Sequence, residues 1–166
     1  MCRIFSILLL KSYLKMQITP SKLNTLLLFK LPAAYFTGVR VTFLNSESCS
    51  ASVKFRWINQ NPFKSMYWAV QGMAAELTTG TLIIAKIKKE NLNISMLLIG
   101  NSANFIKRSR GRLTFTCEEG KLVDEIIAKA LSTGKGQSIK MNAKGIDEAG
   151  QEVSNFTFEW GLKVRD

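Results

Sequence analysis

One acidic residue stands inside the most apolar segment of the chain. Residues 65–87 read SMYWAVQGMAAELTTGTLIIAKI, and Glu76 is the only acid among them. Burying a carboxylate is costly unless it is paired or protonated, so its presence needs a reason. Gly72, Glu76 and Gly80 are spaced i, i+4, i+8 on one helix face, and we expect the glycines to leave open space beside the carboxylate. The pattern indicates a general base or a nucleophile, or else a structural carboxylate paired with Arg or Lys across a dimer.

The densest basic run is a candidate phosphate site. It consists of Lys107, Arg108, Arg110 and Arg112, and its arginines share one face if the segment is extended. Guanidinium groups bind phosphate through paired hydrogen bonds. The net charge of +11 also favours an anionic partner, such as a phosphate-bearing ligand. The alternative is a solvated strand edge whose charges prevent aggregation.

The chain contains no histidine, which removes several chemistries. Triads of Ser-His-Asp or Cys-His type are impossible, and so are zinc sites that use His. The three cysteines, Cys2, Cys49 and Cys117, are far apart and form no CxxC pair. We expect no metal, three reduced thiols and a cytoplasmic protein, with Cys117 in the core because it alternates with apolar residues.

Nucleic acid is the competing use of the positive charge. Single-stranded nucleic acid is bound by exposed aromatic rings beside basic groups. Four rings lie on the apolar side of alternating patterns and are expected to face inward: Phe55, Trp57, Phe156 and Phe158. No helix-turn-helix or zinc pattern occurs either. A nucleic-acid partner is therefore not expected.

The periodicity of apolar residues predicts an α+β fold. Consecutive hairpins imply an antiparallel sheet, and the helix over 65–87 is apolar nearly all round, so the sheet must curve around it. The predicted elements are a helix over 23–31 ended by Pro32, strands near 39–43 and 53–57, the helix over 65–87, strands over 92–99 and 112–117 (the latter starting near Phe105), a surface helix over 122–131, and strands over 139–144 and 153–164.

We expect residues 1–18 to be a poorly defined N-terminal extension and residues 19–166 to form a single domain. The apolar run Ile4–Leu10 is too short to span a membrane. Three interpretations stay open: an extension upstream of a true start at Met16 or a frayed first helix, a lipid-facing amphipathic stretch, and a signal peptide.

The segment NPFKSMYWAVQGMAAELTTG resembles the hot-dog superfamily, and within it the phenylacetyl-CoA thioesterase-like branch and its thioesterase-like relatives. That branch has an Asn, a short loop, His-Gly-Gly at the start of the central helix, and an acid nine residues after the His. The Asn matches Asn61, and the acid matches Glu76. Tyr67, Trp68 and Ala69 stand where the family has His-Gly-Gly.

The resemblance covers about residues 20–165 and implies a hot-dog fold with acyl-CoA thioesterase activity, without metal or organic cofactor; coenzyme A is part of the substrate. Residues 67 and 76 are about 13 Å apart along one helix, so the family's site forms between the two helices of a homodimer. Whether dimers form tetramers stays open. The implied catalytic residues are Glu76, Tyr67 and Asn61, and the implied substrate-binding residues are Trp68, Ala69, Gly72, Thr79, Gly80, Lys107, Arg108 and Arg110.

The missing His-Gly-Gly keeps two other functions open: an acyl or acyl-CoA binding protein without catalysis, and an interaction domain without a ligand. Individual residues also keep alternatives. Asn61 could bond loop backbone or substrate, and Tyr67 could donate a hydrogen bond or only pack. The hydroxyl of Thr78 or Thr79 could orient a water molecule.

Overall fold

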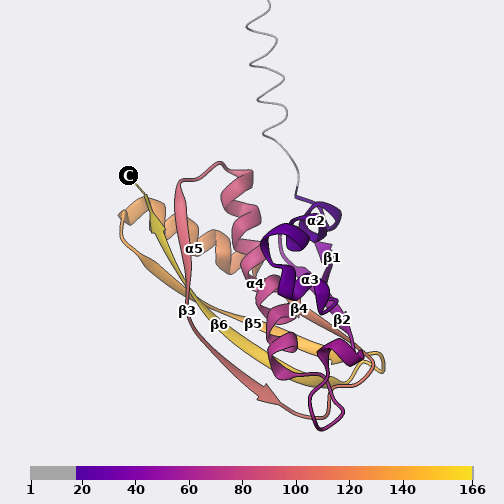
Figure 1. The fold of residues 1–166 in the computed structure, drawn as a ribbon. Helices are drawn as coiled ribbons and strands as arrows, with labels where there is room; N and C mark the ends of the chain where they lie inside the picture. The colour runs from indigo at the N-terminus through magenta and orange to yellow at the C-terminus, as the bar shows by residue number, and fades with distance from the viewer. Residues whose placement is uncertain (1–17, 166) are drawn as a thin grey trace, which may run out of the picture.

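The computed structural model describes residues 18–165 (Figure 1). The predicted order of elements is confirmed: a helix, two strands, a long helix, and four strands with a small helix inserted. The elements are α2 (Pro20–Lys30), α3 (Pro32–Phe36), β1 (Arg40–Leu44), β2 (Cys49–Lys54), the short helix η1 (Trp57–Asn59), α4 (Trp68–Lys89), β3 (Ile94–Phe105), β4 (Arg112–Cys117), α5 (Gly120–Thr133), β5 (Gln137–Asp147) and β6 (Glu152–Val164). The interpretations of Ile4–Leu10 and Met16 concern residues outside the described part.

The six strands form one antiparallel sheet in the order β1-β2-β4-β5-β6-β3. The sheet curves around α4, which lies along its concave side (Figure 1). This is the expected hot-dog architecture. In β5 and β6 the side chains alternate between buried and more exposed positions, so one face of each strand contributes to the apolar floor under the helix, together with β2 and β4.

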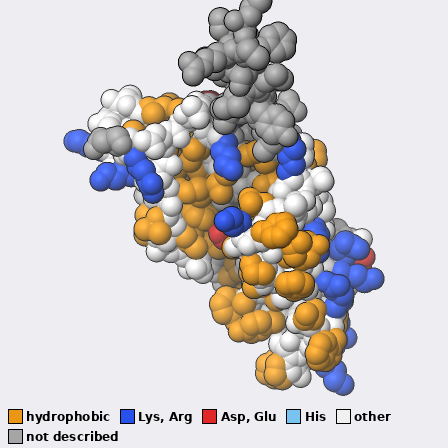
Figure 2. All heavy atoms as spheres, turned by 45° about the horizontal axis from the view of Figure 1, so that its top comes forward, with side chains coloured by type: hydrophobic (Ala, Val, Ile, Leu, Met, Phe, Trp, Pro, Cys, Tyr) orange, Lys and Arg blue, Asp and Glu red, His pale blue; other side chains and the backbone are white. Residues whose placement is uncertain are grey.

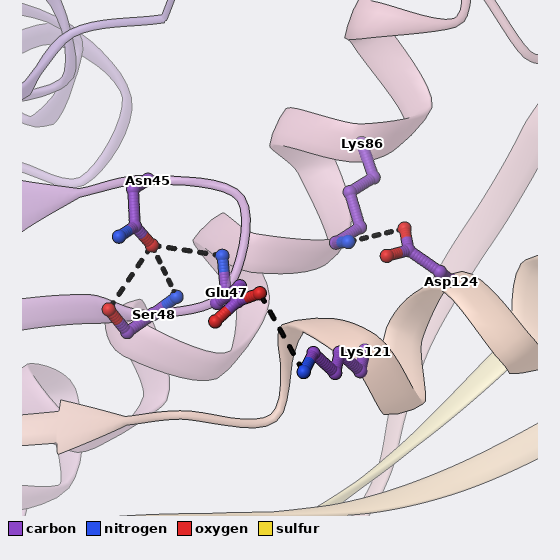
Figure 3. Close-up of polar contacts among 6 residues, drawn as sticks. All are labelled: Asn45, Glu47, Ser48, Lys86, Lys121 and Asp124. Carbon is purple, nitrogen blue, oxygen red and sulfur yellow. Dashed lines mark hydrogen bonds and ion pairs between the residues drawn. The ribbon is translucent and has the colours of Figure 1, made fainter.

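Helix α4 is buried along most of its length, as its composition predicts. One of its buried residues is charged: the Lys86 ammonium forms an ion pair with Asp124 of α5 (Figure 3). A buried ammonium requires such a partner. The pair therefore fixes α5 against the second half of α4, away from the start of the central helix.

Helix α5 begins against the turn between β1 and β2. The Asn45 side-chain oxygen accepts hydrogen bonds from the N–H groups of Glu47 (2.9 Å) and Ser48 (2.6 Å), which closes the turn (Figure 3). The Gly120 N–H donates to the Glu47 carbonyl at 2.8 Å. A Cβ on Gly120 would lie 2.3 Å from the Ser46 carbonyl oxygen, so only glycine fits at this contact.

Four local predictions are wrong. Phe43 is exposed because a bulge after Val41 shifts the alternation of β1. Trp57 is not an inward strand residue: it starts η1, and its side chain is 83% exposed. Gly100 does not end a strand, since β3 continues through a second bulge to Phe105. Strand β4 does not start near Phe105, because Phe105 ends β3 and β4 begins only at Arg112. Pro32 does end α2, as predicted, and it also begins α3.

The edge strand β3 has an unusual composition. Residues 94–105 contain no charged side chain, and Leu97 is 71% exposed. Natural sheets commonly place charges on an exposed edge to prevent pairing with other chains. Within the part that the structure covers, no helix is long and apolar enough to cross a membrane.

Candidate active site

A cavity of about 300 Å³ lies at the N-terminal end of α4. It is bounded by the loop before the helix, the first turns of the helix, and the chain that leaves β3. Of the predicted site residues, the structure brings Asn61, Trp68, Lys107 and Arg108 together there. The complete lining is Asn61, Ser65, Met66, Trp68, Gln71, Phe105, Ile106, Lys107, Arg108 and Ser109.

Asn61 organises the loop and also presents a free donor. Its side-chain oxygen accepts hydrogen bonds from the N–H groups of Phe63 (3.0 Å) and Ser65 (3.2 Å). Because backbone N–H groups only donate, the amide oxygen must face them, and the amide nitrogen must face away. Among residues 18–165 that nitrogen has no partner. Both roles considered from the sequence are therefore compatible: Asn61 bonds loop backbone, and its NH₂ group is available to a ligand.

The start of α4 offers two more donors. Tyr67 occupies the N-cap position, but its side chain caps no backbone group. The N–H groups of Trp68 and Ala69 have no hydrogen-bond partner within the described residues. Unpaired N–H groups at a helix N-terminus carry partial positive charge and stabilise an oxyanion or anion. The resemblance implied that Trp68 and Ala69 bind the substrate, and such donors are one way in which they could do so.

Sequence reasoning missed Gln71. Its side chain is only 3% exposed, and it lines the cavity. Its Nε2 donates to the Met66 carbonyl at 3.3 Å, and its Oε1 accepts from the Ser154 hydroxyl at 2.9 Å. The carbonyl fixes the orientation of the amide, which leaves one N–H for a ligand. The signal was present, since Gln71 is an uncharged polar residue in the same apolar segment as Glu76.

The basic run divides into residues with different roles. Lys107 forms an ion pair with Asp147 at 2.5 Å, which lowers the pKa of that carboxyl, and also donates to Gln151. Arg110 donates to the Lys64 carbonyl at 3.3 Å. Arg108 has no partner in the described part of the chain. The segment between β3 and β4 is a loop, so the expected shared face does not form, and Arg108 is the cation left for a ligand at the cavity.

Glu76 does not line this cavity. Its side chain is half-buried, and burial raises the pKa of its carboxyl above the ordinary value of 4.5. Within residues 18–165 the carboxylate has neither a hydrogen bond nor an ion pair. The expected open space is filled: a Cβ on Gly80 would lie 3.2 Å from the Trp160 ring, and one on Gly72 would lie 3.5 Å from the Phe156 ring. The glycines serve close packing of the helix on β6.

Two other predicted site residues lie away from the cavity. The Tyr67 ring is partly exposed and packs edge-on against Trp68, with centroids 5.8 Å apart. Thr79 is fully buried, and its hydroxyl accepts a hydrogen bond from the Trp160 ring nitrogen at 3.0 Å. Thr78 is buried too and donates to the Ala75 carbonyl. Neither threonine is placed to orient a water molecule in this cavity.

The buried contacts of Gln71 give a first prediction. Gln71→Leu keeps the volume but leaves the Ser154 hydroxyl and the Met66 carbonyl without partners, which we expect to lower the free energy of unfolding by about 2 kcal/mol. In a Ser154→Ala background the same change should cost measurably less, because one unpaired group is already gone. Urea unfolding of both single variants and the double variant measures the coupling. Strictly additive losses would contradict the shared hydrogen bond.

The comparisons with known proteins agree with this fold. A family model described as "Domain of unknown function (DUF4442)" matches residues 22–162. No curated protein sequence matches the chain. The solved structures that match the chain share the fold predicted from the sequence, a curved antiparallel sheet around a long central helix.

Three of these structures illustrate the likeness. A protein of unknown function from Chlorobaculum tepidum TLS has a TM-score of 0.77 at 15% identity, over 90% of this chain and 99% of that one. One from Pseudomonas aeruginosa, described as a probable thioesterase, has a TM-score of 0.73 at 17% identity, over 89% and 97%. A thioesterase from Haemophilus influenzae has a TM-score of 0.67 at 14% identity, over 90% and 94%. Identities this low show the fold alone.

Proposed function

This chain belongs to the DUF4442 family, a domain family of unknown function, and we propose that it hydrolyses an acyl-CoA thioester to a carboxylic acid and free coenzyme A. The observation that carries the proposal is a set of unpaired donors at the start of α4, two of them on residues that line the cavity, Asn61 and Trp68, and the third on the adjacent Ala69. The Asn61 amide nitrogen and the N–H groups of Trp68 and Ala69 have no partners within residues 18–165. The thioesterase descriptions of two fold neighbours belong to those proteins, and they make the same chemistry a reasonable expectation here.

The donors would bind the thioester carbonyl oxygen. As water adds to the carbonyl carbon, negative charge develops on that oxygen, and fixed N–H groups stabilise it. The free guanidinium of Arg108, at the rim of the same cavity, would bind a phosphate of coenzyme A. Lys107 would contribute less, because Asp147 already neutralises it.

Glu76 would act as the general base, supplied by a second copy of the chain. A second copy is needed because Glu76 does not line the cavity of its own chain. The carboxylate would take a proton from water, the water oxygen would bond to the carbonyl carbon, and the carbon–sulfur bond would break. The proton would then pass to the leaving thiolate. Direct attack by the carboxylate, through a mixed anhydride that water hydrolyses, is the other route.

The edge strand supports a homodimer. Glycines 72 and 80 place the Glu76 face of α4 over β6 and β3, since their nearest neighbours are Phe156, Trp160 and Met96. The outer edge of β3 is uncharged and partly apolar, so it can add a second β3 strand through backbone hydrogen bonds. Such pairing would bring the Glu76 faces of two copies toward each other. The free thiols of Cys49 and Cys117 suit a reducing compartment, so we place the reaction in the cytoplasm.

The test is a panel of acyl-CoA substrates of different chain length, with release of free thiol as the readout. We expect turnover, at a rate proportional to protein concentration once the concentration is high enough for nearly all chains to be dimeric. The Trp68 ring at the cavity favours one alternative, an acyl-CoA binding protein without catalysis, because the ring reduces the space at the helix start. Thermal stabilisation by acyl-CoA without thiol release would support that alternative. If acyl-CoA causes neither thiol release nor thermal stabilisation, both functions are contradicted.

A further inference from the structure

The loop before α4 ends in large apolar side chains that face solvent. Trp57 is 83% exposed, Phe63 is 73% exposed, and Ile58 is also exposed. We call these three residues the aromatic tip. They come from η1 and from the turn that follows it, and neither ring takes part in an aromatic contact within residues 18–165. Several large apolar side chains exposed together at the end of a loop are typical of a surface that binds a protein or a membrane.

The surroundings of the aromatic tip are basic. Arg56 precedes Trp57, Lys64 follows Phe63, and Arg110 is held beside them through its hydrogen bond to the Lys64 carbonyl. All three side chains are exposed. The two stretches that build this end of the molecule, residues 48–75 and 91–117, contain no acidic residue. Figure 2 shows hydrophobic side chains at this lower end of the molecule, with Lys and Arg along its margin.

The nearby acids do not cancel this charge. The closest hairpin, between β5 and β6, carries Asp147 and Glu148. Asp147 is already paired with Lys107. Glu148 accepts a hydrogen bond from the Arg112 N–H at 3.3 Å, on the β4 side of the loop. No ion pair joins Asp147 or Glu148 to Arg56, Lys64 or Arg110 within residues 18–165, so the cations next to the aromatic tip remain available to an external partner.

We propose that the aromatic tip docks the protein on an anionic lipid surface. Trp and Phe rings partition into the interface of a bilayer, and neighbouring Lys and Arg side chains are attracted to anionic headgroups. A single loop with three apolar side chains can insert only shallowly and reversibly into the membrane surface, and it cannot span the bilayer. This docking does not rest on the proposed hydrolysis. If both hold, Asn61 and Ser65, which line the cavity beside the tip, would bring its opening close to the lipid.

Two other occupants fit the aromatic tip less well. A second copy of the chain would place like charges against one another here, whereas the uncharged edge of β3 offers it a better surface. Nucleic acid normally stacks on rings in a basic groove, and the rings of the aromatic tip stand free instead. The exposure of Trp57 nevertheless removes one reason that the sequence gave against nucleic acid, so an oligonucleotide belongs in the test.

The test is co-sedimentation of the full chain with lipid vesicles. Binding to phosphatidylcholine vesicles with about 30% phosphatidylserine is expected, with little binding to pure phosphatidylcholine. The double variant Trp57→Ala/Phe63→Ala should bind these vesicles at least about tenfold more weakly than the wild type. Phe29→Ala is the matched control, because Phe29 is also 73% exposed but belongs to α2, which Figure 1 shows away from the loop before α4.

Charge is tested separately. Lys64→Glu should weaken vesicle binding, whereas Lys129→Glu, the same change on exposed α5, should not. Binding should also fall in about 1 M salt. Three results would overturn the proposal. The double variant could still bind vesicles, or it could change its oligomeric state while its lipid binding stays the same. The wild type could also bind an oligonucleotide but no vesicles, with the oligonucleotide binding lost in the double variant. None of these readouts requires turnover.

Discussion

Glu76→Gln is expected to lower the rate of acyl-CoA hydrolysis by about 10²- to 10⁴-fold, the usual contribution of a general base. Gln has nearly the same shape as Glu but cannot take a proton from water. The Glu76 carboxyl also predicts the pH profile. Burial raises its pKa above 4.5, so the base is lost by protonation as pH falls, and the acid limb of the rate profile should lie above 4.5.

Stability separates this role from a structural one. A carboxyl whose pKa is raised by folding destabilises the folded state once it ionises, so stability declines as pH rises from 4.5 through the raised pKa. Glu76→Gln removes this penalty. The variant should therefore unfold at equal or higher urea concentration than the wild type at neutral pH. A less stable variant that also dissociates would show that Glu76 pairs with a cation across the dimer, and the proposed chemistry would be wrong.

Mixed dimers test whether two chains share each site. The Glu76→Gln chain keeps the cavity donors, and an Asn61→Ala chain keeps the acid. When both are refolded together in equal amounts, half of the dimers are mixed, and each mixed dimer has one complete site, so about a quarter of the wild-type rate should return. Activity equal to the mean of the two separate variants would instead place the acid and the donors in the same chain.

Gly120→Ala is expected to lower the free energy of unfolding by about 3 kcal/mol, because the new Cβ meets backbone rather than a movable side chain. It would lie 2.3 Å from the Ser46 carbonyl oxygen and 2.5 Å from the Glu47 Cα atom. The turn cannot withdraw easily, since Asn45 holds it with three hydrogen bonds. Relief would require loss of the Gly120–Glu47 backbone hydrogen bond as well.

The matched control is Gly136→Ala. A Cβ there would have its nearest neighbour at 3.9 Å, an ordinary contact, and the residue is exposed in the loop after α5. The change should leave the urea midpoint within error of the wild type or raise it slightly, since alanine restricts the unfolded chain. Equal destabilisation by the two variants would mean that the turn against α5 is more yielding than its hydrogen bonds indicate.

Local patterns predicted most of the fold because they are read from neighbouring residues. Thr19 caps α2 through its hydroxyl, and Gly150 turns the last hairpin with a φ of 76°. The errors arose where one residue shifts a pattern. The bulge after Val41 exposes Phe43, and the strand that should have buried Trp57 had already ended at Lys54. Alternation alone does not reveal a bulge, because it assumes an unbroken ladder.

In the candidate site, too, the sequence named several of the residues but not the contacts that they make. Asn61, Trp68 and Arg108 all line the cavity. The sequence named each of them as a candidate but did not show that the basic run lies beside the start of α4. The partners of Lys107 and Gln71 could not be predicted, because Asp147 and Ser154 lie far along the chain and meet them only through the sheet. Sequence spacing on one helix face also does not show what fills the space, as Trp160 beside Gly80 demonstrates.

The uncharged edge of β3 affects how the total enzymatic activity in a cell depends on the amount of protein made. Under the proposed assembly every working centre needs two polypeptides, so specific activity falls when the protein is diluted below its association range. At low expression the total activity in the cell would then rise more steeply than the amount of protein. It would become proportional to the amount of protein only once nearly all chains are dimeric. A lysine introduced at Leu97 would make the protein easier to keep in solution and, at the same dose, less productive.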